Sequence, residues 1–273
     1  MRRVLILGAL LAVAGSAVAA GAIKWKSSYE MAVAEAKSTH RLVMVDFYTD
    51  WCTWCKRLDA DTYPAPAVEK EAESFVPVKV NAEKEGVAAA KKYDVEGYPT
   101  VVFLQPDGTL VWKISGYLPA EDFAKQMHLA SSVTTEVPAL ETKLKANPTD
   151  ATVAAQLVPY YSGMAKLDKI PAVVKVIDQG TAAPAVKADA YNAAGDAFQN
   201  ANKNDDAVPY FEKAIQQNLP HQAAYARMSI AQCYLTSGQA AKAKPYLQAL
   251  ADMGSIAGDY GTEAKKLLDQ MKS

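Results

Sequence analysis

The sequence predicts an α/β domain at residues 22–131 followed by an all-α domain at residues 138–273. Between residues 41 and 115, short apolar segments rich in β-branched side chains alternate with helical segments and with turns that contain Pro or Gly. After residue 138 no strand pattern occurs, and large and small apolar residues recur at helical spacing. The polar, β-branched stretch 131–137 separates the two patterns.

The elements of the first domain follow from turn residues and periodicity. Ser27 and Glu30 match a capping box for a helix that reaches Thr39. Residues 41–49 are apolar and partly β-branched, which is typical of a buried strand. The run 106–108 (PDG) is a hairpin signal between two later strands. The remaining expected elements are helices at 52–63, 67–74, 86–93 and 119–130 and strands at 75–80, 100–104 and 110–115.

The second domain carries a repeat of large, small and aromatic residues. Residues 188–219 match the tetratricopeptide pattern at Tyr191, Ala194, Gly195, Phe198, Ala207, Phe211 and Ala214. A second copy follows 36 residues later, a weaker copy precedes, and residues 261–272 form an expected capping helix. Small residues let paired helices approach, and each unit must stack on its neighbours to bury its open face. The alternative is an irregular helical bundle.

Composition places the chain among globular proteins and limits its partners. Its 273 residues suffice for two modest domains, and half of them are apolar. The net charge of −1 excludes nucleic acid as the main partner, because no basic excess exists to neutralise phosphates. No stretch after the N-terminal segment is apolar and long enough to span a bilayer, so we expect no other contact with a membrane.

Residues 1–20 have the order of a secretory signal peptide. Arg2 and Arg3 precede an apolar run at 4–14, which is followed by small residues. We expect cleavage after Ala19 or Ala20 and a periplasmic or otherwise extracytoplasmic mature protein. The alternative is an uncleaved anchor, for which the run is short, since a membrane span needs about 20 apolar residues.

Cys52 and Cys55 are the residues that indicate a catalytic site. They follow a predicted strand and open a predicted helix, where unpaired backbone N–H groups and a partial positive charge favour a thiolate at Cys52. Cys55 lies one helical turn further on. We predict a redox-active dithiol that needs no cofactor, in which an exposed Cys52 attacks a substrate disulfide and a more buried Cys55 resolves the mixed disulfide.

A C-x-x-C pair has two other uses in proteins. It can supply half of a zinc site, but zinc takes four ligands and the other candidates are scattered, so we expect no metal. It can also form a purely structural disulfide in an oxidising compartment, which would leave the position between strand and helix unexplained. The third cysteine, Cys233, lies in a predicted helix beside Tyr234, and we expect a buried, inert thiol.

The motifs around the dithiol resemble those of the thioredoxin superfamily. These motifs are 46–48 (DFY), 51–56 (WCTWCK), 97–100 (GYPT) and Gly116. Over residues 23–130 the chain is similar to the C-terminal thioredoxin-like domain of the bacterial thiol reductase DsbD. The resemblance implies a mixed sheet flanked by helices, with the dithiol at the end of a central strand.

The resemblance also implies roles for two charged residues. Asp46 matches a buried acid beneath the dithiol, whose raised pKa would let it exchange a proton with Cys55. Lys79 matches a lysine that neighbours this acid. The alternatives are a satisfied polar group at the strand end for Asp46 and a solvated charge for Lys79.

Three further residues are implied to form the substrate cleft. Pro99 matches a cis-proline opposite the dithiol, which would leave neighbouring backbone groups free to bind a substrate chain. Trp51 and Tyr98 are the expected aromatic contacts, and Lys56 is an expected supporting residue. The alternative for Pro99 is an ordinary proline at the entry of a strand.

The chain departs from the family at the residues between its cysteines. Thr53 and Trp54 place no cation between the sulfurs, so we predict a Cys52 pKa near the thioredoxin value of about 7 rather than the strongly oxidising value of about 3.5. This favours a reductase or isomerase over an oxidase. The membrane electron-transfer segment of DsbD has no counterpart here, so an external protein is expected to donate or accept electrons.

The leading prediction is an exported thiol–disulfide oxidoreductase that reduces or isomerises disulfides of extracytoplasmic proteins. In this interpretation the helical repeats recruit a client or a redox partner. The alternative from another class is a binding or chaperone module that keeps the fold for interaction, although such a module does not need an intact dithiol. A dedicated assembly factor, which reduces apocytochrome or metal-site thiols, would use the same chemistry on another client.

Overall fold

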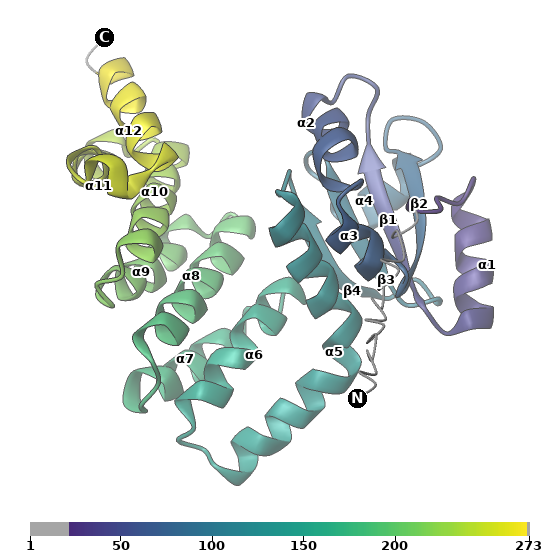
Figure 1. Ribbon diagram of the computed structural model, residues 1–273, viewed down its shortest axis with the longest axis horizontal. Helices are drawn as coiled ribbons and strands as arrows, with labels where there is room; N and C mark the ends of the chain where they lie inside the picture. The colour runs from purple at the N-terminus through teal and green to yellow at the C-terminus, as the bar shows by residue number, and fades with distance from the viewer. Residues whose placement is uncertain (1–21, 272–273) are drawn as a thin grey trace, which may run out of the picture.

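A four-stranded mixed sheet forms the centre of the first domain in a computed structural model, which describes residues 22–271 (Figure 1). The predicted signal peptide lies outside the described residues. The strands are β1 (Leu42–Tyr48), β2 (Phe75–Asn81), β3 (Thr100–Leu104) and β4 (Leu110–Ser115), in the order β2-β1-β3-β4. β1 is parallel to β2 and antiparallel to β3, which pairs antiparallel with β4. The predicted α/β order and mixed sheet are confirmed.

Helices cover both faces of this sheet. Side chains alternate between the faces along each strand, so Val43, Val45 and Phe47 pack with α1 (Tyr29–Thr39) and α4 (Val87–Lys92). Met44 points the other way, into a core shared with η1 (Leu58–Thr62), which continues α2 (Thr53–Arg57), and with α3 (Pro66–Ala72) and α5 (Ala120–Ala146). Asp46 lies two residues after Met44 and therefore faces the helix that carries the cysteines.

The start of α1 differs from the prediction by one residue. The N-cap is Ser28, whose side chain accepts a hydrogen bond from the backbone N–H of Met31 at 3.2 Å. Ser27 instead donates to the Met31 sulfur at 3.1 Å, so the predicted capping box of Ser27 and Glu30 is wrong. Two adjacent serines both suit an N-cap, and the position of the first turn decides which of them serves.

The predicted helix at 52–63 is present but changes its winding. After α2 the chain continues as a π-helical turn, η1 (Leu58–Thr62), in which the backbone N–H of Tyr63 donates to the carbonyl of Leu58 at 3.0 Å. Such turns insert one extra residue into a helix and are frequent at functional sites. The wider turn carries Asp59 and Tyr63, which both reach the neighbourhood of Lys79 on β2.

Helix α5 runs through the stretch that the sequence suggested as a break. The expected end near Ala130 is wrong, because the helix continues to Ala146. The hydroxyls of Ser131 and Ser132 donate to the carbonyl of His128 one turn earlier, so these half-buried polar residues are accommodated within the helix. The apolar residues Val133 and Val137 of the same stretch are buried. The boundary between residues 131 and 138 thus falls inside a helix and stays a prediction.

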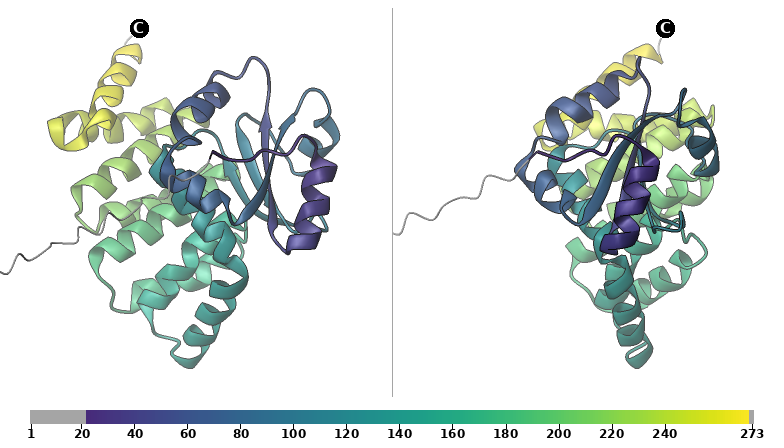
Figure 2. Two further views of the ribbon diagram at one scale, coloured as in Figure 1. Left: turned by 45° about the vertical axis from the view of Figure 1, so that its right-hand side comes forward. Right: turned by 90° about the vertical axis from the view of Figure 1, so that its right-hand side faces the viewer.

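The second part consists of stacked helical hairpins in the described residues (Figure 2). The helices are α6 (Ala151–Gly163), α7 (Ile170–Gln179), α8 (Pro184–Asn200), α9 (Asn204–Ile215), α10 (Pro220–Thr236), α11 (Ala240–Asp252) and α12 (Asp259–Gln270). α8 and α10 begin 36 residues apart, in agreement with the predicted repeat. Gly195 has the expected reason to be small, because a Cβ there would lie 2.6 Å from the Phe211 ring. None of the described helices combines the length and the apolarity needed to cross a bilayer.

The two parts share one hydrophobic core. Buried side chains from the sheet, α5 and the repeat helices form a single cluster. At its centre the buried Trp112 of β4 meets the Tyr160 ring of α6 edge to face, with the ring centroids 6.3 Å apart. α5 leaves the sheet and α6 returns beside it (Figure 1). The repeats are therefore fixed to the sheet by packing.

Candidate active site

The two cysteines of the C-x-x-C motif form a disulfide at the start of α2. Their Cα atoms are 5.3 Å apart, which confirms that the spacing brings the sulfurs together. Cys52 is the N-cap of α2, and its sulfur accepts a hydrogen bond from the backbone N–H of Cys55 at 3.0 Å. This N–H would favour a negative charge on the Cys52 sulfur after reduction, as predicted for the attacking thiolate.

The expected difference in exposure between the cysteines is absent in the disulfide. Cys52 is 3% exposed and Cys55 is 4% exposed, so the prediction of an exposed Cys52 is wrong for this state. The exposed side chains are instead Trp51, at 65%, and Trp54, at 52%. The large side chains on the surface beside the disulfide are therefore aromatic rings, and the sulfur atoms themselves are nearly hidden.

Asp46 lies beneath α2 and is paired with Lys79. The two residues are register partners on the adjacent parallel strands β1 and β2, and their side chains meet at 2.8 Å between Lys79 Nζ and Asp46 Oδ2. Asp46 is only 1% exposed. Burial raises the pKa of Asp46 above its ordinary value, and the charge of Lys79 offsets this only in part.

Lys79 is held by a second carboxylate and by aromatic rings. Asp59 of the π-helical turn also pairs with its ammonium group. The Lys79 nitrogen lies 4.7 Å from the ring centre of Trp25 and 4.8 Å from that of Tyr63, within the range of cation–π attraction. Burial alone would lower the pKa of Lys79, but the two carboxylates outweigh it and raise the pKa, so the lysine stays charged.

Two buried oxygen atoms beside this cluster, Asp46 Oδ1 and the Tyr63 hydroxyl, make no well-formed hydrogen bond within residues 22–271. The two groups still interact, because Tyr63 lowers the pKa of Asp46 and Asp46 raises that of Tyr63. Buried polar atoms without a well-formed hydrogen bond are rare in folded proteins and call for an explanation, such as a catalytic role or a bound water molecule. Burial raises the pKa of Tyr63 well above its ordinary value, so its hydroxyl remains protonated and Asp46 is the group able to titrate.

Neither Trp25 nor Asp59 nor Tyr63 was among the site residues predicted from the sequence, although Tyr63 lies in the region of resemblance to DsbD. Trp25 precedes the first helix and carries no local signal for a position beside β2. Asp59 lies four residues after Cys55, a spacing that places both on one face of a helix, and this was the one signal available.

The predicted cleft residues lie at the same end of the sheet as the cysteines. The peptide bond between Tyr98 and Pro99 is cis, as the resemblance implied. The ring of Trp51 meets that of Tyr98 edge to face, with the centroids 5.9 Å apart, and its indole N–H donates to Glu83 at 3.0 Å. Lys56 is exposed and forms no ion pair within the described part of the chain. The roles of these residues stay predictions.

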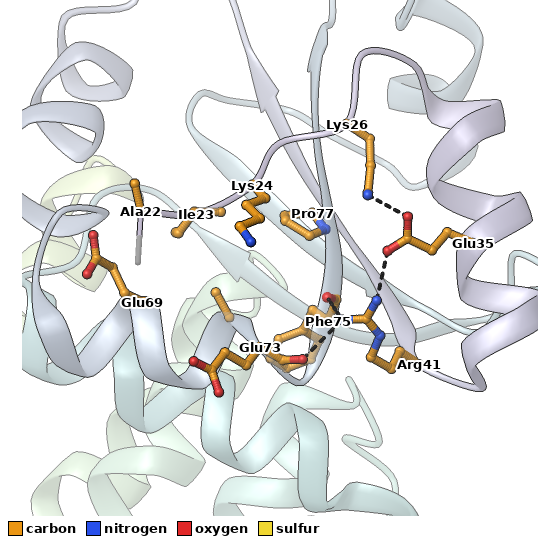
Figure 3. A pocket seen from close by; sticks show the side chains of 11 residues that line it. Ala22, Ile23, Lys24, Lys26, Glu35, Arg41, Glu69, Glu73, Phe75 and Pro77 are labelled. Carbon is orange, nitrogen blue, oxygen red and sulfur yellow. Dashed lines mark hydrogen bonds and ion pairs between the residues drawn. The ribbon is translucent and has the colours of Figure 1, made fainter. Parts of the chain in front are cut away.

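A cavity of about 340 Å³ lies at the other end of β1 and β2 (Figure 3). Three of its charged side chains are paired with one another. Glu35 binds Lys26 and Arg41, and the Arg41 guanidinium also donates to the carbonyls of Glu73 and Phe75. Because these pairs link α1, α3 and β2, the cluster is explained by its contribution to the fold.

Comparison with known proteins agrees with this geometry. A family model for a thioredoxin-like domain matches residues 29–131, and one for a tetratricopeptide repeat matches residues 188–220. The thiol:disulfide interchange protein DsbD of Cronobacter sakazakii is 29% identical over 128 residues, which are 45% of this chain and 22% of the relative. DsbD of Vibrio cholerae is 33% identical over 102 residues, which are 36% of this chain and 17% of the relative. The chain thus spans about a fifth of the length of these relatives.

Solved structures match the same region. A thioredoxin from Thermus thermophilus is 31% identical with a TM-score of 0.37, covering 40% of this chain and 86% of the thioredoxin. The reduced C-terminal domain of DsbD from Neisseria meningitidis is 27% identical with a TM-score of 0.33, covering 36% of this chain and 90% of that domain. Residues 29–131 thus form a thioredoxin-like domain with a disulfide between Cys52 and Cys55, and this domain is similar to thiol–disulfide oxidoreductases, whereas residues 188–220 match a tetratricopeptide repeat.

Proposed function

We propose that the protein is an exported enzyme that reduces or isomerises disulfides in extracytoplasmic proteins. The observation that carries this proposal is the Cys52–Cys55 disulfide at the N-cap of α2, above a buried carboxyl with a raised pKa. Thiol–disulfide interchange is also the reaction named for the curated relatives. The export of the protein rests on the signal-peptide pattern of residues 1–20.

The proposed cycle starts when an external dithiol reduces the disulfide. The Cys52 thiolate then attacks a substrate disulfide, forming a bond to one substrate sulfur and releasing the other as a thiolate. Asp46 takes the proton of Cys55, and the Cys55 sulfur attacks Cys52. The second substrate thiolate leaves and the disulfide re-forms. Two electrons pass from the dithiol to the substrate in each catalytic cycle.

The repeats are proposed to recruit a client or a redox partner. Stacked repeats present an extended surface to a bound chain. The shared core with Trp112 fixes this surface relative to the dithiol, so a recruited chain would be held at a constant distance from Cys52.

Reduction of insulin by dithiothreitol tests the proposed reaction. The wild-type protein is expected to accelerate the precipitation of insulin chains, and Cys52→Ser is expected to remove the acceleration because the attacking sulfur is lost. Cys233→Ala is the matched control, since Cys233 is buried in α10 and burial raises its pKa to about 11, and it should retain wild-type activity. Equal activity of wild type and Cys52→Ser would favour the binding-module alternative.

Asp46→Asn is expected to slow insulin reduction at neutral pH by about 10²-fold, at the lower end of the range for proton transfer by a positioned side chain. Asparagine keeps the shape of the side chain but cannot take the proton of Cys55. The pH profile of the rate distinguishes this role from a structural one. The variant is expected to lose the part of the acidic limb that is due to Asp46 and to keep the part that is due to ionisation of Cys52, whereas an unchanged profile would contradict the assignment.

The same variant has an expected effect on stability. The pKa of Asp46 is raised in the folded protein, so between its ordinary value and the raised value the folded state holds a proton that the unfolded state has lost. Stability of the wild type therefore falls as the pH rises through this window. An asparagine side chain does not titrate. The Tm of the variant minus that of the wild type should therefore increase as the pH rises above the ordinary aspartate pKa of about 4. A constant difference in Tm would contradict the raised pKa.

A further inference from the structure

A second aromatic pair stands beside the disulfide, formed by Trp54 and Tyr117. Their rings are tilted by 37° with centroids 5.5 Å apart. The guanidinium carbon of Arg57 lies 5.4 Å from the Trp54 ring centre and 5.1 Å from that of Tyr117, so one cation contacts both rings. The three side chains form a continuous surface, called here the Trp54 wall.

The Trp54 wall is formed by two chain segments that are hydrogen-bonded to each other. Trp54 and Arg57 belong to α2, and Tyr117 lies in the loop that follows β4. The hydroxyl of Thr62, at the end of the π-helical turn, donates to the carbonyl of Leu118 at 2.8 Å and ties these two segments together. The rings therefore need little rearrangement to receive a ligand, which lowers the entropic cost of binding.

The exposure of the Trp54 wall is not explained by the fold. Trp54 is 52% exposed and lies in contact with the Tyr117 ring, and grouped exposed apolar side chains, unlike single ones, mark interaction sites. Arg57 donates through Nε to Asp61 at 3.1 Å, and its two terminal nitrogens form no hydrogen bond within residues 22–271. Those nitrogens are available to a carboxylate, which guanidinium groups bind through two parallel hydrogen bonds.

The position of the Trp54 wall links it to the reaction. Trp54 lies between the two cysteines in the chain, and Cys52 is only 3% exposed. A substrate chain that reaches Cys52 therefore comes close to the exposed Trp54 side chain, two residues further along the chain. The pair of Trp51 and Tyr98 differs from the pair of Trp54 and Tyr117 in the charge beside it. The Trp51 indole N–H donates a hydrogen bond to the Glu83 carboxylate, whereas the Trp54 ring contacts the Arg57 cation.

We infer that Trp54, Tyr117 and Arg57 determine specificity, by selecting extended polypeptides that carry a large apolar side chain next to the oxidised cysteine and a carboxylate close to it. The inference rests on the proposed function and adds the class of substrate. The apolar side chain packs on the exposed Trp54 ring, and the carboxylate binds the terminal nitrogens of Arg57. The thiol–disulfide exchange steps of the proposed cycle stay the same.

The test uses short peptides whose single cysteine forms a mixed disulfide with 2-mercaptoethanol. One peptide carries Phe before the cysteine and Glu after it, a second has Ser in place of Phe, and a third has Lys in place of Glu. Bis(2-hydroxyethyl) disulfide is the small reference substrate. Dithiothreitol is the reductant, and kcat/KM is measured for the full chain by chromatography of the released peptide thiol.

We expect the wild type to prefer the peptide with Phe and Glu, and Trp54→Ala to lower kcat/KM for this peptide by about tenfold, in the range of one lost apolar anchor. Arg57→Gln should remove the preference for Glu over Lys, and added salt should weaken it in the wild type. The small disulfide should react equally with all variants. Val87→Ala and Lys91→Gln are matched controls, because they remove an exposed apolar and an exposed cationic side chain from α4.

Two results would overturn the inference. If an active wild type reduces the three peptides at the same rate, or if Trp54→Ala lowers the rate with the small disulfide by the same factor, the Trp54 wall does not select substrates. Failure of the wild type to reduce any disulfide, including the small one, would instead overturn the proposed function together with this inference.

Discussion

Replacement of Cys55 with alanine is expected to stop turnover after one event and to leave the client bound to Cys52 through a mixed disulfide. In the wild type the Cys55 backbone N–H contacts the Cys52 sulfur, and the two Cα atoms are 5.3 Å apart, so Cys55 can reach the intermediate without a change of fold. Without the second sulfur, release of the client needs an external thiol, which reacts more slowly at a nearly buried site.

The trapped species is measurable as a band of higher mass on non-reducing gels that disappears with dithiothreitol. Combining Cys55→Ala with Cys233→Ala should leave the adduct unchanged, which assigns it to Cys52. The reciprocal variant, Cys52→Ala, should accumulate no client. An adduct that forms at Cys55 in that variant, and none at Cys52, would reverse the proposed roles of the two cysteines.

Gly163→Ala is expected to destabilise the whole protein by about 2–3 kcal/mol, the usual cost of overpacking a core. A Cβ at the end of α6 would lie 2.1 Å from two carbon atoms of the Trp112 ring. Trp112 cannot move aside easily, because it is 1% exposed and its indole N–H donates to Gln126 at 3.1 Å. For a chain of this size the expected fall in Tm is about 5–10 °C.

Thermal unfolding followed by circular dichroism measures this effect. Because Gly163 belongs to the repeats and Trp112 to the sheet, a single transition should move to lower temperature. Trp112→Phe removes the ring atoms that clash, so Gly163→Ala should cost less in that background than in the wild type. Gly97→Ala is the control, since a Cβ there meets no atom within 4 Å. A normal Tm for Gly163→Ala would show that the two parts are not packed as described.

The order of strands and helices, the reactive cysteine pair and the helical repeat could all be predicted from the amino-acid sequence. These features have local signals. Alternation between strands and helices, the two-residue spacing of Cys52 and Cys55, and the 36-residue spacing of α8 and α10 are each contained in one stretch of chain. The assignment of Asp46, Lys79 and Pro99 needed the resemblance to the thioredoxin superfamily, because a lone charged residue or proline has no meaning by spacing alone.

The contacts between segments far apart in the chain could not be predicted in this way, because they depend on how the elements pack in three dimensions. Trp25, Asp59 and Tyr63 surround Lys79 because three separate segments converge on β2, and Tyr117 joins Trp54 from a distant part of the chain in the same way. Helix α5 continues through a polar stretch because the buried side of that stretch packs on the core, which local propensity does not report. Whether a side chain is covered depends on its neighbours in space, and for this reason the near-burial of Cys52 could not be predicted from its position at the start of a helix.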